Sequence, residues 1–137
     1  ARAAARLTHR NLVRAYEAGV HEGHYWLAME LVEGEDLGER LTWTASLTEL
    51  EALDVGIQVA RALDAAATAG LVHRDVKPEN ILLGDDGVVR LGDLGLAKVR
   101  GDASLTADGI TLGTVAYLSP EQCRGAKDLD VRSDLFA

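Results

Sequence analysis

Residues 73–80 have the sequence His-Arg-Asp-Val-Lys-Pro-Glu-Asn, and Asp93-Leu94-Gly95 begins thirteen residues after Asn80. Between these two stretches, short apolar runs flank Gly-Asp-Asp-Gly at residues 84–87, and this pattern predicts a β-hairpin. A hairpin returns the chain to the place where it started. We therefore expect the side-chain oxygens of Asn80 and Asp93 to come together at one point.

A helix is predicted before this stretch. Thr48 is followed three residues later by Glu51, which is the capping-box pattern of a helix start. Apolar residues then recur with helical spacing, and Gly70 closes the helix. The residues on this apolar face are Leu50, Leu53, Ile57, Ala60 and Leu63. Residues 73–80 are thus expected on a loop that follows a long helix.

The other predicted elements are short. The nearly continuous apolar run at residues 25–32 is typical of a buried strand, and Ser119 before Pro120 is typical of a helix start. Residues 96–112 are polar and dotted with glycine, which predicts a long loop, and long loops in compact domains are usually functional or disordered. Further helical or core segments are expected at residues 1–7, 36–41 and 131–137.

The composition excludes several classes of protein. With 22 acidic and 14 basic residues, the 137-residue chain has a formal charge of −8, which argues against a nucleic-acid or anionic-membrane partner. A hydrophobic content of 47% is too high for a disordered tail. Cys123 is the only cysteine, so an internal disulfide is excluded and a reducing compartment is favoured. No apolar run reaches the roughly 18 residues of a membrane-spanning helix.

Taken together, these stretches resemble the eukaryotic-type protein kinase family. The resemblance covers essentially the whole chain, and it implies an α+β, protein-kinase-like two-lobed fold that is incomplete here. Residues 1–32 would be a remnant of the N-lobe with the hinge, and residues 33–137 would be the part of the C-lobe that holds the catalytic and activation loops. The motifs that carry the resemblance are residues 73–80, 93–95, 113–114, 119–121 and Asp134.

Two parts that the family needs are missing from this sequence. It contains no glycine-rich phosphate loop, and its three lysines, Lys77, Lys98 and Lys127, all follow the expected hinge, so none is the lysine of the third strand. The chain also lacks an initial methionine. We therefore expect an internal fragment of a kinase domain, which on its own would be inactive and would expose apolar surface.

The resemblance assigns catalytic roles that the residue types also support. Asp75 would accept the proton of an attacking hydroxyl, and Lys77 would place its ammonium on the transferred phosphate. Asn80 and Asp93 offer hard oxygen ligands, which suit Mg²⁺, so ATP and Mg²⁺ are the expected cofactors. In the family, Lys77 together with Thr114 marks serine/threonine kinases, and Asp75, Lys77 and Thr114 would form one cluster facing the substrate.

The resemblance also predicts where the nucleotide binds. Met29 would be the gatekeeper, and backbone groups of Glu30 and Val32 would bond the edge of the adenine. Asp36 is placed to take a ribose hydroxyl, and Leu82 would pack on the adenine face. The residues themselves leave another interpretation open, because Met29 and Leu82 would also suit a core and Asp36 a helix cap.

Further residues are expected to regulate the site or hold it together. Arg74 would grip a phosphate on the activation loop, because a guanidinium binds phosphate through two parallel hydrogen bonds. The expected structural residues include Leu94, which replaces the usual Phe as an apolar plug, and Glu121, whose usual Arg partner cannot be assigned. The candidate phosphate acceptors are Ser104, Thr106 and Thr111, and the other structural residues are His73 and Asp134.

The sequence thus predicts a serine/threonine protein kinase that acts on protein substrates, itself included, in the cytoplasm. A membrane tether outside these residues is compatible with this prediction. Two alternatives stay open at this point: a kinase-like phosphotransferase of small molecules, and a pseudokinase scaffold that binds partners without catalysis. A glycine-rich loop and a Val-Ala-x-Lys motif upstream would favour catalysis over the scaffold.

Overall fold

The structure is a computed structural model that describes residues 7–94 and 114–137. Its helices and strands confirm the predicted α+β class, because helices alternate with small antiparallel sheets. The elements are β1 (Ala15–His21), β2 (His24–Met29), β3 (Gly34–Asp36), α1 (Leu37–Thr44), α2 (Glu49–Thr68), the 3₁₀ turn η2 (Pro78–Asn80), β4 (Ile81–Gly84), β5 (Val89–Leu91), the 3₁₀ turn η4 (Thr114–Tyr117), α3 (Pro120–Cys123) and α4 (Val131–Phe136).

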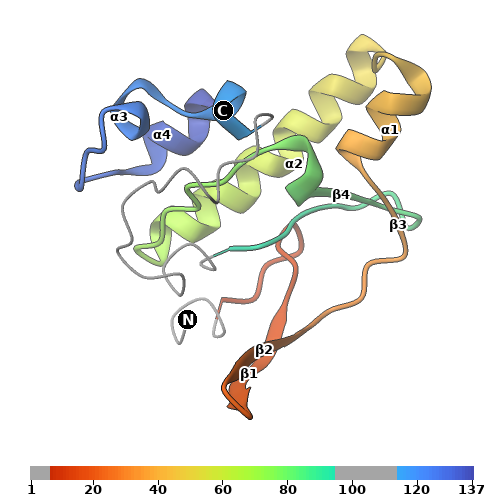
Figure 1. The fold of residues 1–137 in the computed structure, drawn as a ribbon. Coiled ribbons are helices and arrows are strands. Elements are labelled where there is room, and N and C mark those ends of the chain that lie inside the picture. Colours follow the sequence, from red (N-terminus) through yellow and green to blue (C-terminus); the bar gives the residue numbers. More distant parts are fainter. Residues whose placement is uncertain (1–6, 95–113) are drawn as a thin grey trace.

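The strands form two separate antiparallel sheets. Strands β1 and β2 pair with each other as a hairpin, and β3, β4 and β5 form the second sheet in that order. The predicted hairpin around residues 84–87 is confirmed as β4 and β5. Figure 1 shows the β1–β2 hairpin projecting away from the helices. Helix α2 lies between the β3–β4 region and the short helices α3 and α4 in this view.

The β1–β2 hairpin corrects one prediction. Residues 24–29 do form a strand, but the strand is not buried, since Tyr25 is 78% exposed and Trp26 is 42% exposed. The physical reason is that β2 pairs only with β1 within the described residues, so neither face of this two-stranded ribbon receives a packing layer. Continuous apolar character therefore did not indicate burial here.

Helix α2 begins as predicted and packs on a different face. The Thr48 hydroxyl and the Glu51 carboxylate form the expected capping box, and the hydrogen bonds from Thr48 lower the pKa of Glu51. Of the predicted apolar face, only Leu63 is buried. The buried residues of α2 are Gln58, Ala62, Leu63 and Ala66. The helix presents this face to the β4–β5 hairpin and leaves Leu50, at 79% exposure, in solvent.

The core joins the beginning of the chain to the hairpin and α2. Leu12, at 2% exposure, forms an isolated parallel bridge with Leu91, and the amide of Val13 donates to the Leu91 carbonyl. The apolar core consists of Leu12, Leu37, Ala62, Leu63, Val76, Ile81, Val89 and Leu91. Because Val76 and Ile81 flank residues 77–80, this core supports the loop that the sequence singles out.

A buried polar network lies beside the apolar core. The Asn11 side-chain amide donates to Gln58 Oε1 and to the Val89 carbonyl, each at 2.8 Å. Gln58 Oε1 also accepts from the Val89 amide at 2.9 Å. Buried amides are stable only when their hydrogen bonds are satisfied, so these bonds fix residue 11 against α2 and β5.

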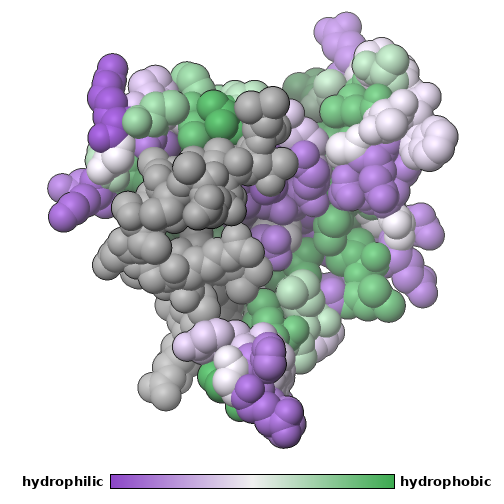
Figure 2. All heavy atoms as spheres, in the orientation of Figure 1, coloured by the Kyte–Doolittle hydropathy of each residue, from purple (hydrophilic) through white to green (hydrophobic). Residues whose placement is uncertain are grey.

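The surface of the described residues is mixed in character. Figure 2 shows hydrophobic patches beside hydrophilic ones on the face in view, and large apolar side chains such as Leu31 and Trp43 are more than 80% exposed (85% and 82%). Among the helices that the structure describes, none combines the length and apolar character that crossing a membrane requires.

Candidate active site

Residues 71–80 connect the end of α2 to β4. Helix α2 ends at Thr68, and Gly70 turns the chain with a φ of +71°, a conformation that glycine adopts without steric penalty. The segment that follows has no regular structure until the 3₁₀ turn η2, in which the Asn80 amide donates to the Lys77 carbonyl at 3.0 Å. This turn directs the Asn80 side chain back toward the start of the loop.

His73 fastens the loop to the strand end of the hairpin. Its side chain is fully buried, and Nε2 lies 2.7 Å from the Gly92 carbonyl oxygen. Because a carbonyl only accepts, Nε2 carries the proton, and Nδ1 is left to accept from the Asp75 amide at 3.3 Å. Both ring nitrogens thus have a hydrogen-bond partner, and the ring joins the Gly92 carbonyl to the Asp75 amide.

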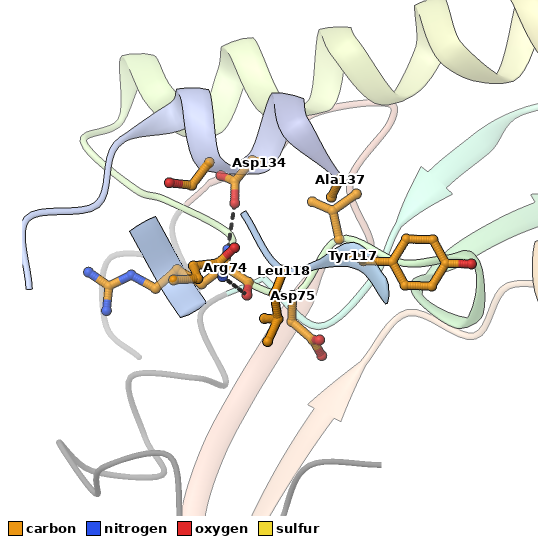
Figure 3. A pocket seen from close by; sticks show the side chains of 9 residues that line it. Arg74, Asp75, Tyr117, Leu118, Asp134 and Ala137 are labelled. Atoms are coloured by element: carbon orange, nitrogen blue, oxygen red, sulfur yellow. Dashed lines mark hydrogen bonds between the residues drawn. The ribbon is translucent and has the colours of Figure 1, made fainter. Parts of the chain in front are cut away.

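Asp134 of α4 holds the same loop from the opposite side. Its carboxylate is buried and accepts from the amide of His73 at 2.8 Å and from the amide of Arg74 at 2.7 Å. The second bond is drawn in Figure 3. Arg74 needs such support because its φ is +71°, in the left-handed region that residues other than glycine rarely adopt. Asp134 therefore bonds two consecutive backbone amides of the loop, and its structural role stays a prediction.

Three predicted catalytic side chains meet within the loop. Lys77 Nζ lies 3.2 Å from Asp75 Oδ2, and Asn80 Nδ2 donates to the same oxygen at 3.1 Å and to the Asp75 carbonyl at 2.7 Å. Asp75 Oδ1 accepts no hydrogen bond from the described residues. The arrangement holds one carboxylate oxygen and leaves the other available as a proton acceptor.

The hairpin brings Asp93 to the same end of the sheet as Asn80. Ile81 pairs with Leu91 across β4 and β5, and the Gly92 amide donates to the Asn80 carbonyl at 2.8 Å. Asp93 follows directly, exposed and with a φ of +56°. Asn80 Nδ2 donates to Asp75, whereas Asn80 Oδ1 has no hydrogen-bond partner among the described residues. An amide oxygen and a carboxylate are hard donors, so this pair fits Mg²⁺ chemically.

The segment expected to be the hinge contains backbone hydrogen-bonding groups that have no partner among the described residues. The Glu30 amide donates to the Arg14 carbonyl at 2.8 Å, whereas the Glu30 carbonyl and the Val32 amide have no hydrogen-bond partner in the part of the chain that the structure describes. One acceptor and one donor on residues two positions apart match the edge of a purine. Met29 is 41% exposed, so it does not belong to the core of the described residues.

An ion-pair bridge ties this segment to the β4–β5 hairpin. Arg90 Nε lies 3.3 Å from Glu30 Oε1, and its terminal nitrogens donate to both carboxylate oxygens of Asp86 at 3.1 and 2.7 Å. The Arg90 side chain is only 15% exposed. These hydrogen bonds from Arg90 lower the pKa of Asp86 to about 2. Residue types alone did not single out Arg90.

Asp36 and Leu82 lie next to each other in the second sheet. Their positions pair directly across β3 and β4. Asp36 Oδ1 accepts from the Glu39 amide at 2.8 Å and thereby caps α1, so the helix-cap interpretation is correct for that oxygen. Leu82 is partly exposed and is therefore accessible to a ligand.

The segment 119–123 contributes one residue that sequence reasoning missed, Gln122. Ser119 caps α3 as predicted, but its capping partner Gln122 also reaches residues 73–80, the expected catalytic loop, where Nε2 donates to the Arg74 carbonyl at 2.8 Å. The Ser119-x-x-Gln122 pattern of a capping box was the available signal. Glu121 accepts from the Ser133 hydroxyl at 2.5 Å, and this bond lowers the pKa of Glu121.

Some predicted residues fall outside this geometry. Ser104, Thr106 and Thr111 lie outside the described residues, as does the side chain of Thr114. The guanidinium of Arg74 and the carboxylate of Asp75 point in different directions in Figure 3. Leu94 is partly buried and packs against the core, as does Leu7, which agrees with its expected role as an apolar plug.

Comparison with known proteins places this geometry in a family. Residues 1–137 match the protein kinase domain family over their full length. Serine/threonine-protein kinase PknL of Mycobacterium tuberculosis is 49% identical over 137 residues, which is 100% of this chain and 34% of the relative. PknJ of the same species is 41% identical over 138 residues, and a probable serine/threonine-protein kinase PknB of Lactococcus lactis is 38% identical over 135 residues. Each of these two comparisons covers 98% of this chain, with 23% of PknJ and 21% of PknB. The chain thus spans about a third or less of the length of these relatives.

Proposed function

This chain belongs to the protein kinase domain family, and on that premise we propose that it forms the catalytic centre of a serine/threonine protein kinase. The observation that carries the proposal is the grouping of Asp75, Lys77 and Asn80, in which Asp75 Oδ2 is held by both neighbours while Oδ1 stays available. Within the domain, we assign residues 1–32 to the N-lobe and hinge and residues 33–137 to the C-lobe.

The proposed reaction is transfer of the terminal phosphoryl group of ATP to a Ser or Thr hydroxyl. The hydroxyl oxygen forms a bond to the phosphorus, the bond from that phosphorus to the bridging oxygen breaks, and the hydroxyl proton passes to Asp75 Oδ1. Lys77 contributes positive charge next to Asp75, where it offsets charge on the phosphoryl oxygens. Asn80 and Asp93 would hold Mg²⁺, which neutralises phosphate charge when it is bound.

The nucleotide would lie between the hinge and the second sheet. The Glu30 carbonyl and the Val32 amide would bond the adenine edge, Leu82 would pack on its face, and Met29 would border the pocket. Asp36 has one carboxylate oxygen engaged in the helix cap and the other available for a ribose hydroxyl.

The proposed partners are protein substrates, including a second copy of the same kinase. Autophosphorylation at Ser104, Thr106 or Thr111 would supply a phosphate for Arg74 to bind. A formal charge of −8 disfavours nucleic acid as a partner. We place the domain in the cytoplasm, where ATP is supplied and the exposed thiol of Cys123 stays reduced.

The test is phosphate transfer by the full-length gene product, with γ-labelled ATP, Mg²⁺ and myelin basic protein as the acceptor. We expect labelled phosphoserine or phosphothreonine, and Asp75→Asn should lower kcat by on the order of 10²- to 10⁴-fold. Asp64→Asn, at an exposed position of α2, is the matched control and should behave as wild type. Undiminished phosphate transfer by Asp75→Asn would refute the proposal. Labelled phosphate on small molecules alone would favour the small-molecule phosphotransferase, and ATP binding without phosphate transfer would favour the pseudokinase scaffold.

A further inference from the structure

We infer that Gln122 is a positioning residue for Asp75, acting through the backbone of Arg74. This inference rests on the proposed function, because it concerns the placement of the group proposed to accept the substrate proton. The observation behind it is a single hydrogen bond between segments 48 residues apart, from Gln122 Nε2 to the Arg74 carbonyl at 2.8 Å.

The bond meets the loop at its most constrained residue. Arg74 precedes Asp75 and has a φ of +71°, which residues other than glycine rarely adopt. Its amide is held by Asp134 Oδ1 at 2.7 Å, and its carbonyl is held by Gln122. Figure 3 shows Arg74 and Asp134 in this arrangement. With both polar backbone groups bound, the peptide plane that leads into Asp75 is fixed in one orientation.

The orientation of the Gln122 amide is also fixed. Gln122 Oε1 accepts from the Ser119 backbone N–H at 3.0 Å, and in return the backbone N–H of Gln122 donates to the Ser119 hydroxyl at 3.3 Å. If the side chain were flipped, its NH₂ group would face an N–H and its oxygen would face a carbonyl. The capping box of α3 and the bond to the catalytic loop therefore depend on the same side-chain orientation.

The same chain shows why glutamine is required at this position. The capping box of α2 has a glutamate, Glu51, in the corresponding place, so helix capping alone does not need an amide. A glutamate at position 122 would still accept from the Ser119 amide. It has no donor for the Arg74 carbonyl, however, and would place a carboxylate oxygen against a carbonyl oxygen. The amide nitrogen thus serves the catalytic loop and not the helix.

The test compares Gln122→Glu with Gln58→Glu in the full-length gene product. Both changes convert a half-buried or buried glutamine to glutamate, keep the hydrogen bonds that the oxygen accepts and remove one bond that the side-chain NH₂ donates. The bond lost at position 58 goes to Asp54 Oδ2 on the same helix at 2.9 Å, whereas the bond lost at position 122 goes to the Arg74 carbonyl. Two measurements are made: kcat and KM for ATP, and hydrogen exchange of the peptide containing residues 73–80 by mass spectrometry. The second measurement does not depend on catalysis.

For Gln122→Glu we expect a kcat lowered roughly ten- to a hundredfold, an ATP KM within about twofold of wild type, and faster exchange at residues 73–80. Gln58→Glu should change neither kcat nor exchange of that peptide. Wild-type kcat and exchange in Gln122→Glu, or equal effects of both variants, would overturn the inference. If wild type transfers no phosphate, the proposed function fails, and faster exchange in Gln122→Glu alone would still support the positioning role.

Discussion

Replacing Asp134 by asparagine should loosen the catalytic loop without unfolding α4. The Asp134 side chain is 4% exposed, and its two carboxylate oxygens accept from the amides of His73 and Arg74 at 2.8 and 2.7 Å. Asparagine has the same shape but only one acceptor, so its NH₂ group would face one of these two amides. One buried N–H would then lose its partner.

The magnitude follows from these two bonds. A hydrogen bond to a charged group contributes about 1.5–3 kcal/mol, and a buried donor left unsatisfied costs about 1–3 kcal/mol. We therefore expect the free energy needed to open the loop to fall by roughly 3 kcal/mol, which is the sum of these two contributions with each taken near its lower bound. Since about 1.4 kcal/mol corresponds to a factor of ten, the amides of residues 73 and 74 should exchange roughly a hundredfold faster.

Hydrogen exchange of the full-length gene product, resolved to the peptide that contains residues 73–80, measures this change. Asp130→Asn is the matched control, because Asp130 begins the same helix but is exposed and pairs with Arg132, which is a solvent-exposed ion pair. Solvent screens such exposed pairs, so Asp130→Asn should leave exchange of the loop unchanged. Less than a tenfold acceleration in Asp134→Asn would show that the carboxylate does not hold the loop.

Two further predictions concern the β3–β4–β5 sheet. Gly34 has a φ of +143°, and a Cβ there would meet the Leu83 carbonyl oxygen. Gly34→Ala should therefore lower the free energy of unfolding by about 2 kcal/mol or more. Gly56 lies in open space on α2, so Gly56→Ala should raise the free energy of unfolding by up to about 1 kcal/mol. Urea unfolding of both variants measures this difference, and equal stabilities would contradict it. The pKa of Asp86 is lowered from 3.8 to about 2 by hydrogen bonds from Arg90. The ionised Asp86 carboxylate therefore stabilises the folded state above pH 4, and this contribution to the free energy of unfolding is lost as the pH falls toward 2. Asp86→Asn should therefore flatten the dependence of stability on pH between 4 and 2, and an unchanged acid slope would refute the assignment.

The parts of the site that could be predicted from sequence are those set by neighbouring residues. Asp75, Lys77 and Asn80 lie within six positions of one another, and the turn between them brings their side chains together. The β4–β5 hairpin and the α2 capping box are equally local, because their turn and cap residues determine the backbone directly. For these elements the prediction and the structure agree.

The contacts that could not be predicted join residues far apart in the chain. Gln122 bonds Arg74 across 48 positions, and Asn11 bonds Gln58 across 47. Each polar residue has many possible partners, and only the tertiary fold selects one. Arg90 illustrates the same point, because a basic residue in a strand gives no sign that it will bridge Glu30 and Asp86. Of the side chains that bond residues 73–80 from elsewhere in the chain, Asp134 was expected from the family resemblance, whereas Gln122 was not.

The buried face of α2 shows why periodicity was insufficient there. Helical spacing identifies residues that share a face, but it does not identify which face meets the core when apolar residues occur on several sides. Gln58 decides the outcome, since its amide oxygen accepts from Asn11 and from the Val89 amide and so draws its own face against β5. Alanine at positions 62 and 66 then allows close approach of the strand, while Leu50 and Leu53 stay exposed. The buried face of α2 thus combines one hydrogen-bonded glutamine with small and apolar side chains, a combination that apolar spacing alone does not identify.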